Sequence, residues 1–354
     1  MRQKYLAEGK TIKRKIGAIV ILTGLLIAGA GILCNREQES KLIIRVGYFP
    51  DIVHAQVIIG RANGTFAKVF SPTYDLDWKM FNAGPSAIEA LFAGELDLSY
   101  IGPNPAINGY IKSKGKALRI VAGAASGGAG LVVRKDAGIN NLADFHHKKV
   151  ATPQLGNTQD VACRFWFQSH GFLPPEKGGD LQIIPIANPD QLNLIRKKEI
   201  DAVWTKEPWV TRLIKEADAR LFMDERDIWE QGEFVTAHLI VSTKFLEQHR
   251  DIVKQWIGLQ VDLTTWINQH PQEAKKIINA EIKKMTGHAL SEPVLDDAFS
   301  RVKITDDPIS NSLLKSAAWA YEIGFLGKER PDLSGIYDLS LLKEVFKEKE
   351  AGTH

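Results

Sequence analysis

The chain has 354 residues, of which 44% are hydrophobic and 25% charged, and its formal net charge is +3. The positive charge sits at the start, where six lysines and arginines against Glu8 give +5 before residue 16, so the rest of the chain is near −2. A near-neutral body lacks the basic face that nucleic-acid binding requires. Composition therefore excludes a nucleic-acid partner, and the length suits two domains of ordinary size.

The first predicted element is an apolar run over residues 16–33 that follows the basic segment. Basic residues followed by an apolar run are typical of a secretory signal or signal anchor whose positive end stays in the cytoplasm. A buried core helix would instead place polar residues at every third or fourth position. We therefore expect residues 1–35 to be a leader or anchor, and the rest to be extracytoplasmic and tethered to the membrane.

The sequence allows three interpretations of how this leader is processed. Cys34 directly after the run resembles the lipidated cysteine of bacterial lipoproteins, although Leu33 stands where a small residue is usual. Cleavage after Ala30 is the second possibility, and an uncleaved span of the bilayer the third. Lipidation at Cys34 leaves Cys163 as a single thiol, which we expect to be small, buried and structural rather than nucleophilic.

The body of the chain contains an internal repeat. Residues 84–100 align without a gap on residues 188–204, at an offset of 104, and 46–48 meets 150–152 at the same offset. Each copy reads as a turn with proline, an amphipathic helix, a Glu-x-Asp corner and a short strand that ends in an aromatic residue. Chance matching of a common helix-to-strand pattern is the alternative. The repeat predicts two similar α/β lobes with a cleft between them.

Candidate ligand-binding residues follow from this pattern, because loops at the carboxyl ends of strands face the cleft of a doubly wound sheet. Gly84 and Ser86 begin one helix and Asn157 and Thr158 another, so their backbone amides and side chains suit a small oxyanion. Ordinary helix capping is the competing interpretation. Tyr48 and Trp204 end strands and are expected to form an apolar wall; His54 and Asp51 follow the first strand.

Signatures of catalysis, metal or cofactor are not evident in the sequence. The glycine-rich stretch 123–130 lacks the residues of a nucleotide site, and we interpret it as the crossover between lobes. His146 and His147 are adjacent rather than spaced as metal ligands are. We therefore expect a binding protein with no cofactor and no metal.

Several motifs together resemble a known family. They are 46–51 (VGYFPD), 84–91 (GPSAIEAL), 94–97 (GELD), 101–105 (IGPNP), 152–158 (TPQLGNT) and 204–209 (WTKEPW). The chain resembles the solute-binding proteins of ABC importers, in the branch for aliphatic sulfonates, taurine and nitrate. The likeness runs from about residue 42 to about 330.

The resemblance implies a type II periplasmic-binding fold, with two doubly wound, mostly parallel lobes that close on a ligand. Lobe 1 is expected over 36–126 and 242–354, and lobe 2 over 127–241. The resemblance places Tyr48, Ser86, Asn104, Asn157, Thr158 and Glu207 in the pocket. No arginine stands at these positions to clamp a sulfonate, whereas Asp51 and Glu207 would suit the amine of taurine.

The function implied is that of an ABC importer's substrate-binding component, a monomer that carries a small anionic or zwitterionic solute to permease and ATPase subunits. Binding of thiamine-pyrimidine precursors is the nearest alternative, since those importers share the fold and the location. A pyrimidine-synthase-like enzyme and a sensory module on an uncleaved anchor are further alternatives. The export leader and the small number of cysteines argue against the enzyme.

Overall fold

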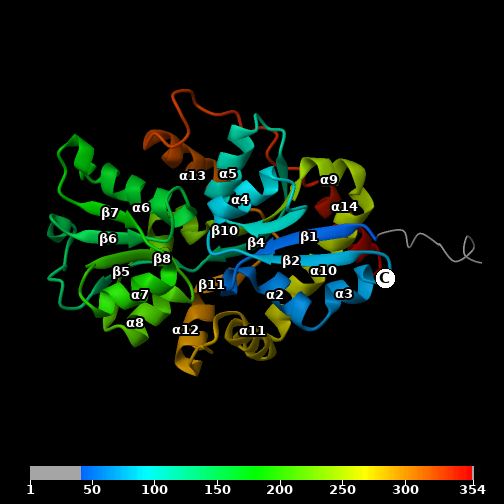
Figure 1. Cartoon of the computed structure of the whole chain (residues 1–354), viewed down its shortest axis with the longest axis horizontal. Coiled ribbons are helices and arrows are strands. Elements are labelled where there is room, and N and C mark those ends of the chain that lie inside the picture. Colours follow the sequence, from blue (N-terminus) through cyan, green and yellow to red (C-terminus); the bar gives the residue numbers. More distant parts are fainter. Residues whose placement is uncertain (1–40, 353–354) are drawn as a thin grey trace, which may run out of the picture. The chain divides into compact units, whose positions relative to one another are not determined.

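The computed structural model describes residues 41–352, and the residues from Ile43 onward form one compact unit. Within the described residues the strands form two separate sheets, each with helices on both faces (Figure 1). The predicted two-lobed α/β architecture is therefore confirmed. The predicted leader, including Ala30 and Cys34, lies outside the described residues. None of the helices in residues 41–352 is long and apolar enough to cross a membrane.

The elements follow one another in three stretches. The first contains β1 (Ile43–Tyr48), η1 (Ile52–His54), α2 (Ala55–Ala62), α3 (Thr65–Phe70), β2 (Asp75–Met80), α4 (Gly84–Phe92), β3 (Leu98–Ile101), α5 (Pro103–Lys112) and β4 (Leu118–Gly127). The second contains β5 (Ala129–Arg134), η2 (Leu142–Phe145), β6 (Lys149–Thr152), α6 (Thr158–Ser169), η3 (Pro175–Lys177), β7 (Gln182–Pro185), α7 (Asn188–Arg196), β8 (Ala202–Lys206), α8 (Trp209–Glu216), β9 (Ala219–Asp224), η4 (Glu225–Ile228) and η5 (Glu230–Gly232). The third contains β10 (Val235–Ser242), α9 (Thr243–Gln248), α10 (Arg250–Gln269), α11 (Pro271–Thr286), α12 (Glu292–Arg301), β11 (Val302–Ile304), α13 (Ser310–Glu322) and α14 (Ser340–Ala351).

The two sheets share one order over five strands, and the first sheet has β11 as an additional edge strand. The first runs β2-β1-β3-β10-β4-β11 and the second β7-β6-β8-β5-β9. In each sheet four strands run in one direction, and β10 or β5 is inserted antiparallel between two of them. Each inserted strand comes directly after the chain has crossed from the other lobe. The two lobes are therefore tied together by two crossings next to the cleft.

The crossings differ in part from the predicted boundaries. The chain leaves the first sheet at Gly127 and Gly128, whose φ angles of 75° and 76° favour glycine. It has returned by β10, which pairs with β3 and β4, so the second crossing precedes the expected boundary at 242. Helix α13, expected in lobe 1 alone, also packs on lobe 2, where Trp319 stacks on Phe165 at 4.8 Å.

The internal repeat is present in the backbone. Helices α4 and α7, each of nine residues, are separated by the predicted 104 residues. The left-handed turns at Gly94 and Lys198 stand at the same offset. The Glu-x-Asp corner has a structural cause, because Asp97 accepts a hydrogen bond from the amide of Arg45 (2.8 Å) in the adjacent strand. Asp201 does the same for the strand-start amide of Lys149 at 2.9 Å.

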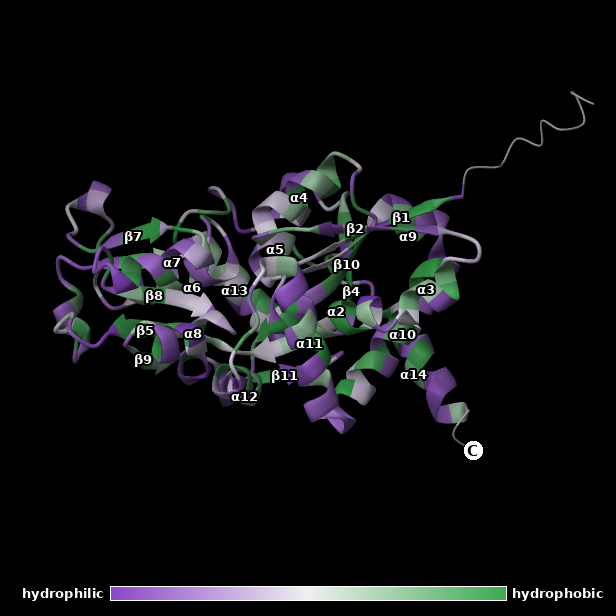
Figure 2. Ribbon diagram, turned by 60° about the horizontal axis from the view of Figure 1, so that its bottom comes forward, coloured by the Kyte–Doolittle hydropathy of each residue, from purple (hydrophilic) through white to green (hydrophobic). Residues whose placement is uncertain are grey.

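The hydrophobic cores fill both faces of each sheet. The helices carry both hydrophobic and hydrophilic residues (Figure 2). In lobe 1, Trp256 of α10 stacks on Phe66 with ring centroids 4.1 Å apart. In lobe 2, Phe145 contacts Phe167 edge to face at 4.9 Å. Because each lobe has its own core, the cleft can change shape without disrupting either.

Candidate functional site

A small hollow between the lobes, which we call the cleft cavity, has a volume of about 30 Å³. This space holds on the order of one water molecule, so a solute of several heavy atoms requires the lobes to part slightly. Lobe 1 lines it with Phe49, His54, Asn82, Ala83, Gly84, Gly102, Pro105 and Thr236, and lobe 2 with Pro153, Asn157, Thr158, Gln159, Asn188 and Lys206.

Four helix N-termini reach this cavity. Gly84 begins α4, Gly102 is the N-cap of α5, Thr158 begins α6 and Asn188 begins α7. The first amides of a helix have no intrahelical acceptor, and the helix dipole adds a partial positive charge there. Helix starts that converge from both lobes favour an anionic group between them.

Lys206 carries the permanent positive charge among the residues that line the cavity in the described part of the chain. It is the last residue of β8, and its Nζ lies 2.6 Å from Oδ2 of Asp51 in the other lobe. The same Nζ lies 5.5 Å from the ring centroid of Phe49. The closed cleft is thus held in part by an ion pair between the lobes.

His54 completes a buried chain of ionisable groups. Its Nδ1 lies 2.9 Å from Oδ1 of Asp51, and its ring stacks on Phe49 at 4.8 Å. Burial lowers the pKa of His54 although the Asp51 carboxylate opposes this. Burial alone would raise the pKa of Asp51, but His54 and Lys206 together hold it well below its usual range. Near neutral pH the three groups are therefore a neutral imidazole, a carboxylate and an ammonium.

Buried polar atoms on both sides of the cavity lack hydrogen bonds of ordinary geometry within the described residues. They are both ring nitrogens of His54 in lobe 1 and Nε2 of Gln159 in lobe 2, and both side chains are at most 2% exposed. Nδ1 of His54 still has Oδ1 of Asp51 at 2.9 Å, and that oxygen lacks a hydrogen bond of ordinary geometry as well. Buried polar groups in proteins are nearly always paired, so unpaired groups on opposite sides of one cavity indicate a ligand.

Four of the residues selected from the sequence line the cavity together: His54, Gly84, Asn157 and Thr158. Asn157 also caps α6, because its side chain accepts from the amide of Asp160 at 2.9 Å. Asp51 lies directly behind the lining, where it contacts His54 and Lys206. The structure therefore brings half of the predicted set to one place.

The two predicted aromatic wall residues do not line it. Tyr48 packs in the lobe 1 core, edge to face with Trp78 at 6.3 Å. Trp204 is fully buried in lobe 2, where its Nε1 donates to Glu225 at 2.7 Å. In lobe 1 the aromatic residue at the cavity is Phe49, one residue after Tyr48, since successive side chains alternate in direction at a strand end.

Three further predicted residues lie outside the cavity lining. Ser86 is half-buried in the first turn of α4. Asn104 ties α5 to α13, because its Oδ1 accepts from Oγ of Ser316 at 2.7 Å. Glu207 is fully buried, caps α8 through Thr211 and contacts Arg301 of lobe 1 at 3.4 Å. Burial raises the pKa of Glu207 to about 7.

Sequence reasoning missed Lys206 and Gln159. Lys206 lies in the 204–209 motif and is the first charged residue after an apolar stretch. This position could have identified it from the sequence. Gln159 follows Thr158 in the first turn of α6, and no feature of the sequence distinguished its side chain. No group of three or more metal-ligating side chains occurs among residues 41–352.

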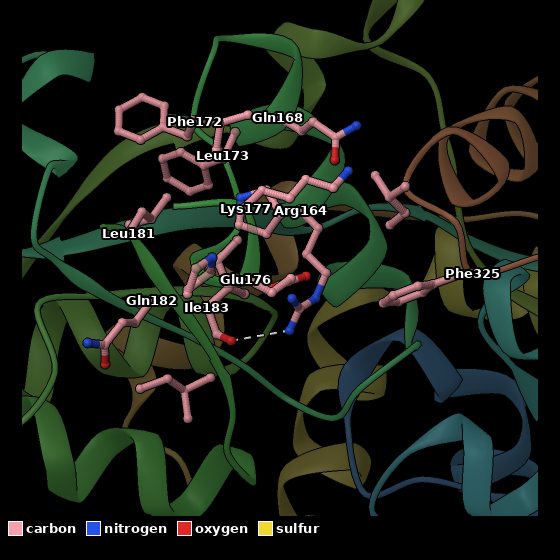
Figure 3. Close-up of a pocket in the computed structure, with 15 residues that line it drawn as sticks. Arg164, Gln168, Phe172, Leu173, Glu176, Lys177, Leu181, Gln182, Ile183 and Phe325 are labelled. Atoms are coloured by element: carbon pink, nitrogen blue, oxygen red, sulfur yellow. Dashed lines mark hydrogen bonds between the residues drawn. The ribbon is translucent and has the colours of Figure 1, made fainter. Parts of the chain in front are cut away.

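A larger hollow of about 580 Å³ lies beside lobe 2, between α6, β7, the segment 172–177 and the residues Ile323 and Phe325 that follow α13 (Figure 3). Its walls are mainly leucine, isoleucine, proline and phenylalanine. The guanidinium of Arg164 is already paired there, with Asp160 at 3.0 Å and the carbonyl of Ile183 at 3.2 Å (Figure 3). Because the charge of Arg164 is already paired and the walls are mainly apolar, we assign the ligand site to the cleft cavity.

Closure of the lobes depends on a glycine. A Cβ on Gly102 would lie 2.5 Å from Oγ1 of Thr158 in the other lobe. The φ of Gly102 is −71°, which alanine adopts without strain. We therefore expect Gly102→Ala to fold normally but to increase the radius of gyration in small-angle X-ray scattering and weaken solute binding about tenfold, or about 1.4 kcal/mol. Gly258→Ala, at a helical position with open space around it, is the control; equal scattering from both variants would contradict the expectation.

Two similar α/β lobes, joined by two crossings and closed over helix N-termini, define a type II periplasmic-binding fold. Solved structures share it: the periplasmic aliphatic sulphonate binding protein SsuA from Escherichia coli matches with a TM-score of 0.66 and 18% identity, over 85% of this chain and 99% of that one. The periplasmic nitrate-binding protein NrtA from Synechocystis PCC 6803 matches with a TM-score of 0.68 and 14% identity, over 87% and 89%.

Sequence comparison gives the family. The taurine-binding periplasmic protein of Escherichia coli (strain K12) is 24% identical over 228 residues, which are 64% of this chain and 66% of that protein. Residues 37–282 match the NMT1-like family. The chain therefore belongs to the NMT1-like family.

Proposed function

We propose that this protein is the extracytoplasmic solute-binding component of an ABC importer, and that its cleft cavity binds a small anionic or zwitterionic solute. An aliphatic sulfonate, taurine or a nitrate-like ion is the expected ligand. The observation that carries the proposal is the convergence of Lys206, four helix starts and the unpaired amide nitrogen of Gln159 on one cavity. Each of these favours an oxyanion, and together they come from both lobes.

The proposed role involves no chemical step. Binding lowers the free energy of the closed form, because the solute contacts both lobes at once. The permease and ATPase subunits then recognise the closed shape. No residue at the cavity is assigned a catalytic role, and the non-enzymatic role also accords with the names of the relatives.

The experiment is isothermal titration calorimetry on the purified full-length chain. Ethanesulfonate, taurine, nitrate, bicarbonate and a hydroxymethylpyrimidine are the probes. We expect at least one of the first four to bind with a micromolar or lower Kd, of the order of −8 kcal/mol. Binding of the pyrimidine alone would contradict the proposal and favour the thiamine-precursor alternative.

We further propose that the protein acts as a monomer held at the outer face of the membrane by a lipid on Cys34. The basic and apolar leader in the sequence supports this. Labelling with a palmitate analogue in the native host should occur in the parent chain and be lost in Cys34→Ser. Absence of label in the parent would instead favour cleavage at Ala30 or a retained anchor.

A further inference from the structure

The cleft cavity has a balanced charge before any solute enters. Asp51 contributes −1 and Lys206 +1, and they lie 2.6 Å apart. His54, whose pKa is lowered by burial, contributes none. All three side chains are largely buried. The exposed fraction is 1% for the His54 side chain and 15% for the Lys206 side chain. A monovalent anion added to this set would leave one uncompensated negative charge away from water, which is costly.

His54 can supply the missing positive charge. In its neutral form the proton belongs on Nδ1, which faces Oδ1 of Asp51 at 2.9 Å. That leaves Nε2 with a lone pair, at the cavity and without a hydrogen bond of ordinary geometry among the described residues. A second proton on Nε2 would create a donor directed at a bound oxyanion, while Nδ1 keeps its contact with Asp51. Both new interactions would be charge-assisted.

From this geometry we infer that a monovalent anion binds in the cleft cavity together with one proton, which His54 takes from solvent. The inference rests on the proposed function. Solute, His54, Asp51 and Lys206 then form a set of two negative and two positive charges. It defines the ligand class as a small monoanion that accepts a hydrogen bond from imidazolium, such as a sulfonate or nitrate. A zwitterion would need no such proton.

The surroundings of His54 contain few other charges. Asp51 lies on its own loop, and Lys206 and the Phe49 carbonyl act on it from nearby. Tyr100 of β3 faces it edge-on at 6.4 Å, and burial raises the pKa of this phenol well above its usual value, so it stays neutral.

Helix α2 and the strands β4, β10 and β11 also pack against η1. Their titratable side chains within the described residues contact other groups: Arg61 contacts Glu281, Arg119 the Gly115 carbonyl, His238 the Pro308 carbonyl and Lys303 Glu233. None of them offsets a charge on His54. The protonation of His54 is therefore governed by Asp51, Lys206 and the solute.

The test is calorimetry of the full-length chain with ethanesulfonate and with nitrate at pH 7.5, in triethanolamine and in Tris buffer. These two cationic buffers do not compete for an anion site and differ in ionisation enthalpy, so the difference in binding heat counts protons. We expect uptake of about one proton per solute, and an affinity that falls about tenfold per pH unit above neutrality. His54→Gln should bind more weakly at pH 7 and take up no proton.

Two further variants test whether the proton uptake depends on Asp51 and is specific to His54. Asp51→Asn removes the negative charge, so it should bind the anion without proton uptake. His238→Gln changes another buried histidine, one that does not line the cavity, and should keep the uptake of the parent chain. Binding of either anion with no proton uptake would overturn the inference and leave the proposed function intact. Binding of taurine alone, without uptake, would also overturn it, and no binding of ethanesulfonate, nitrate or taurine would contradict both proposals.

Discussion

Replacing Lys206 with methionine should weaken solute binding by at least about a hundredfold. Lys206 places its ammonium at the cleft cavity, where it lies 2.6 Å from Asp51 across the lobes. Loss of a charge-assisted hydrogen bond costs about 1.5–3 kcal/mol. The variant also leaves the Asp51 carboxylate buried without its ammonium partner, close to the incoming anion. Calorimetry with the probe solute that binds the parent chain measures the loss of affinity directly.

A matched control variant distinguishes an effect on the cavity from a general effect on closure of the lobes. Lys215 of the same lobe also pairs across the cleft, with Asp297 of lobe 1 at 2.8 Å, but it is far more exposed and lies outside the cavity lining. Lys215→Met should therefore change affinity by less than about threefold. The double variant Lys206→Met, Asp51→Asn removes the unpaired carboxylate and should recover part of the binding. Equal affinities of the parent chain and the Lys206→Met variant would show that the solute does not bind next to the end of β8.

The repeat made the architecture predictable from sequence. Helix α4 and its counterpart α7 keep their spacing because both pack on equivalent strands. The Glu-x-Asp corners recur because Asp97 and Asp201 each accept from a backbone amide 52 residues earlier, in the neighbouring strand. Repeated residue types and amphipathic periods can be recognised in a sequence. Element order, the two lobes and the first crossing were predicted from such patterns.

The second crossing was harder to predict. The apolar sequence of strand β10 would fit either lobe, because an inserted antiparallel strand has the same composition as its parallel neighbours. Only its pairing with β3 and β4 assigns it to lobe 1. Helix α13 bridges both lobes through Trp319, which is a tertiary contact without a sequence period. Boundaries of this kind require the pairing partners to be known.

Side-chain direction limited the site prediction. Tyr48 and Phe49 are neighbours at a strand end, and only the strand register shows that Phe49 faces the cavity. Trp204 points inward because Glu225, 21 residues later, accepts its indole hydrogen. The ion pair of Lys206 with Asp51 joins two lobes, so it exists only when the cleft is closed. The helix starts could be found from sequence because their chemistry is local.

Buried carboxyl groups should make the protein more stable in mild acid than above neutrality. Glu225 is fully buried, and its two oxygens accept from the indoles of Trp204 (2.7 Å) and Trp229 (3.2 Å). Burial outweighs these donors and raises the pKa of Glu225 from 4.5 to about 7. Between these values the folded state binds more protons than the unfolded state, so stability falls as pH rises. The expected loss from Glu225 between pH 4.5 and 8 is about 3 kcal/mol.

Urea unfolding followed by tryptophan fluorescence at pH 5, 6, 7 and 8 measures this slope. The pKa values of Glu207 and Asp306 are also raised to about 7, mainly by burial, and both act in the same direction. Glu225→Gln should therefore flatten the slope by about 3 kcal/mol without abolishing it, since its side chain cannot titrate. Glu230→Gln, on the exposed segment that follows, should leave the slope unchanged. If Glu225→Gln keeps the full slope of the parent chain, then the Glu225 carboxyl is already ionised in the folded state at pH 5, and its two indole donors outweigh its burial.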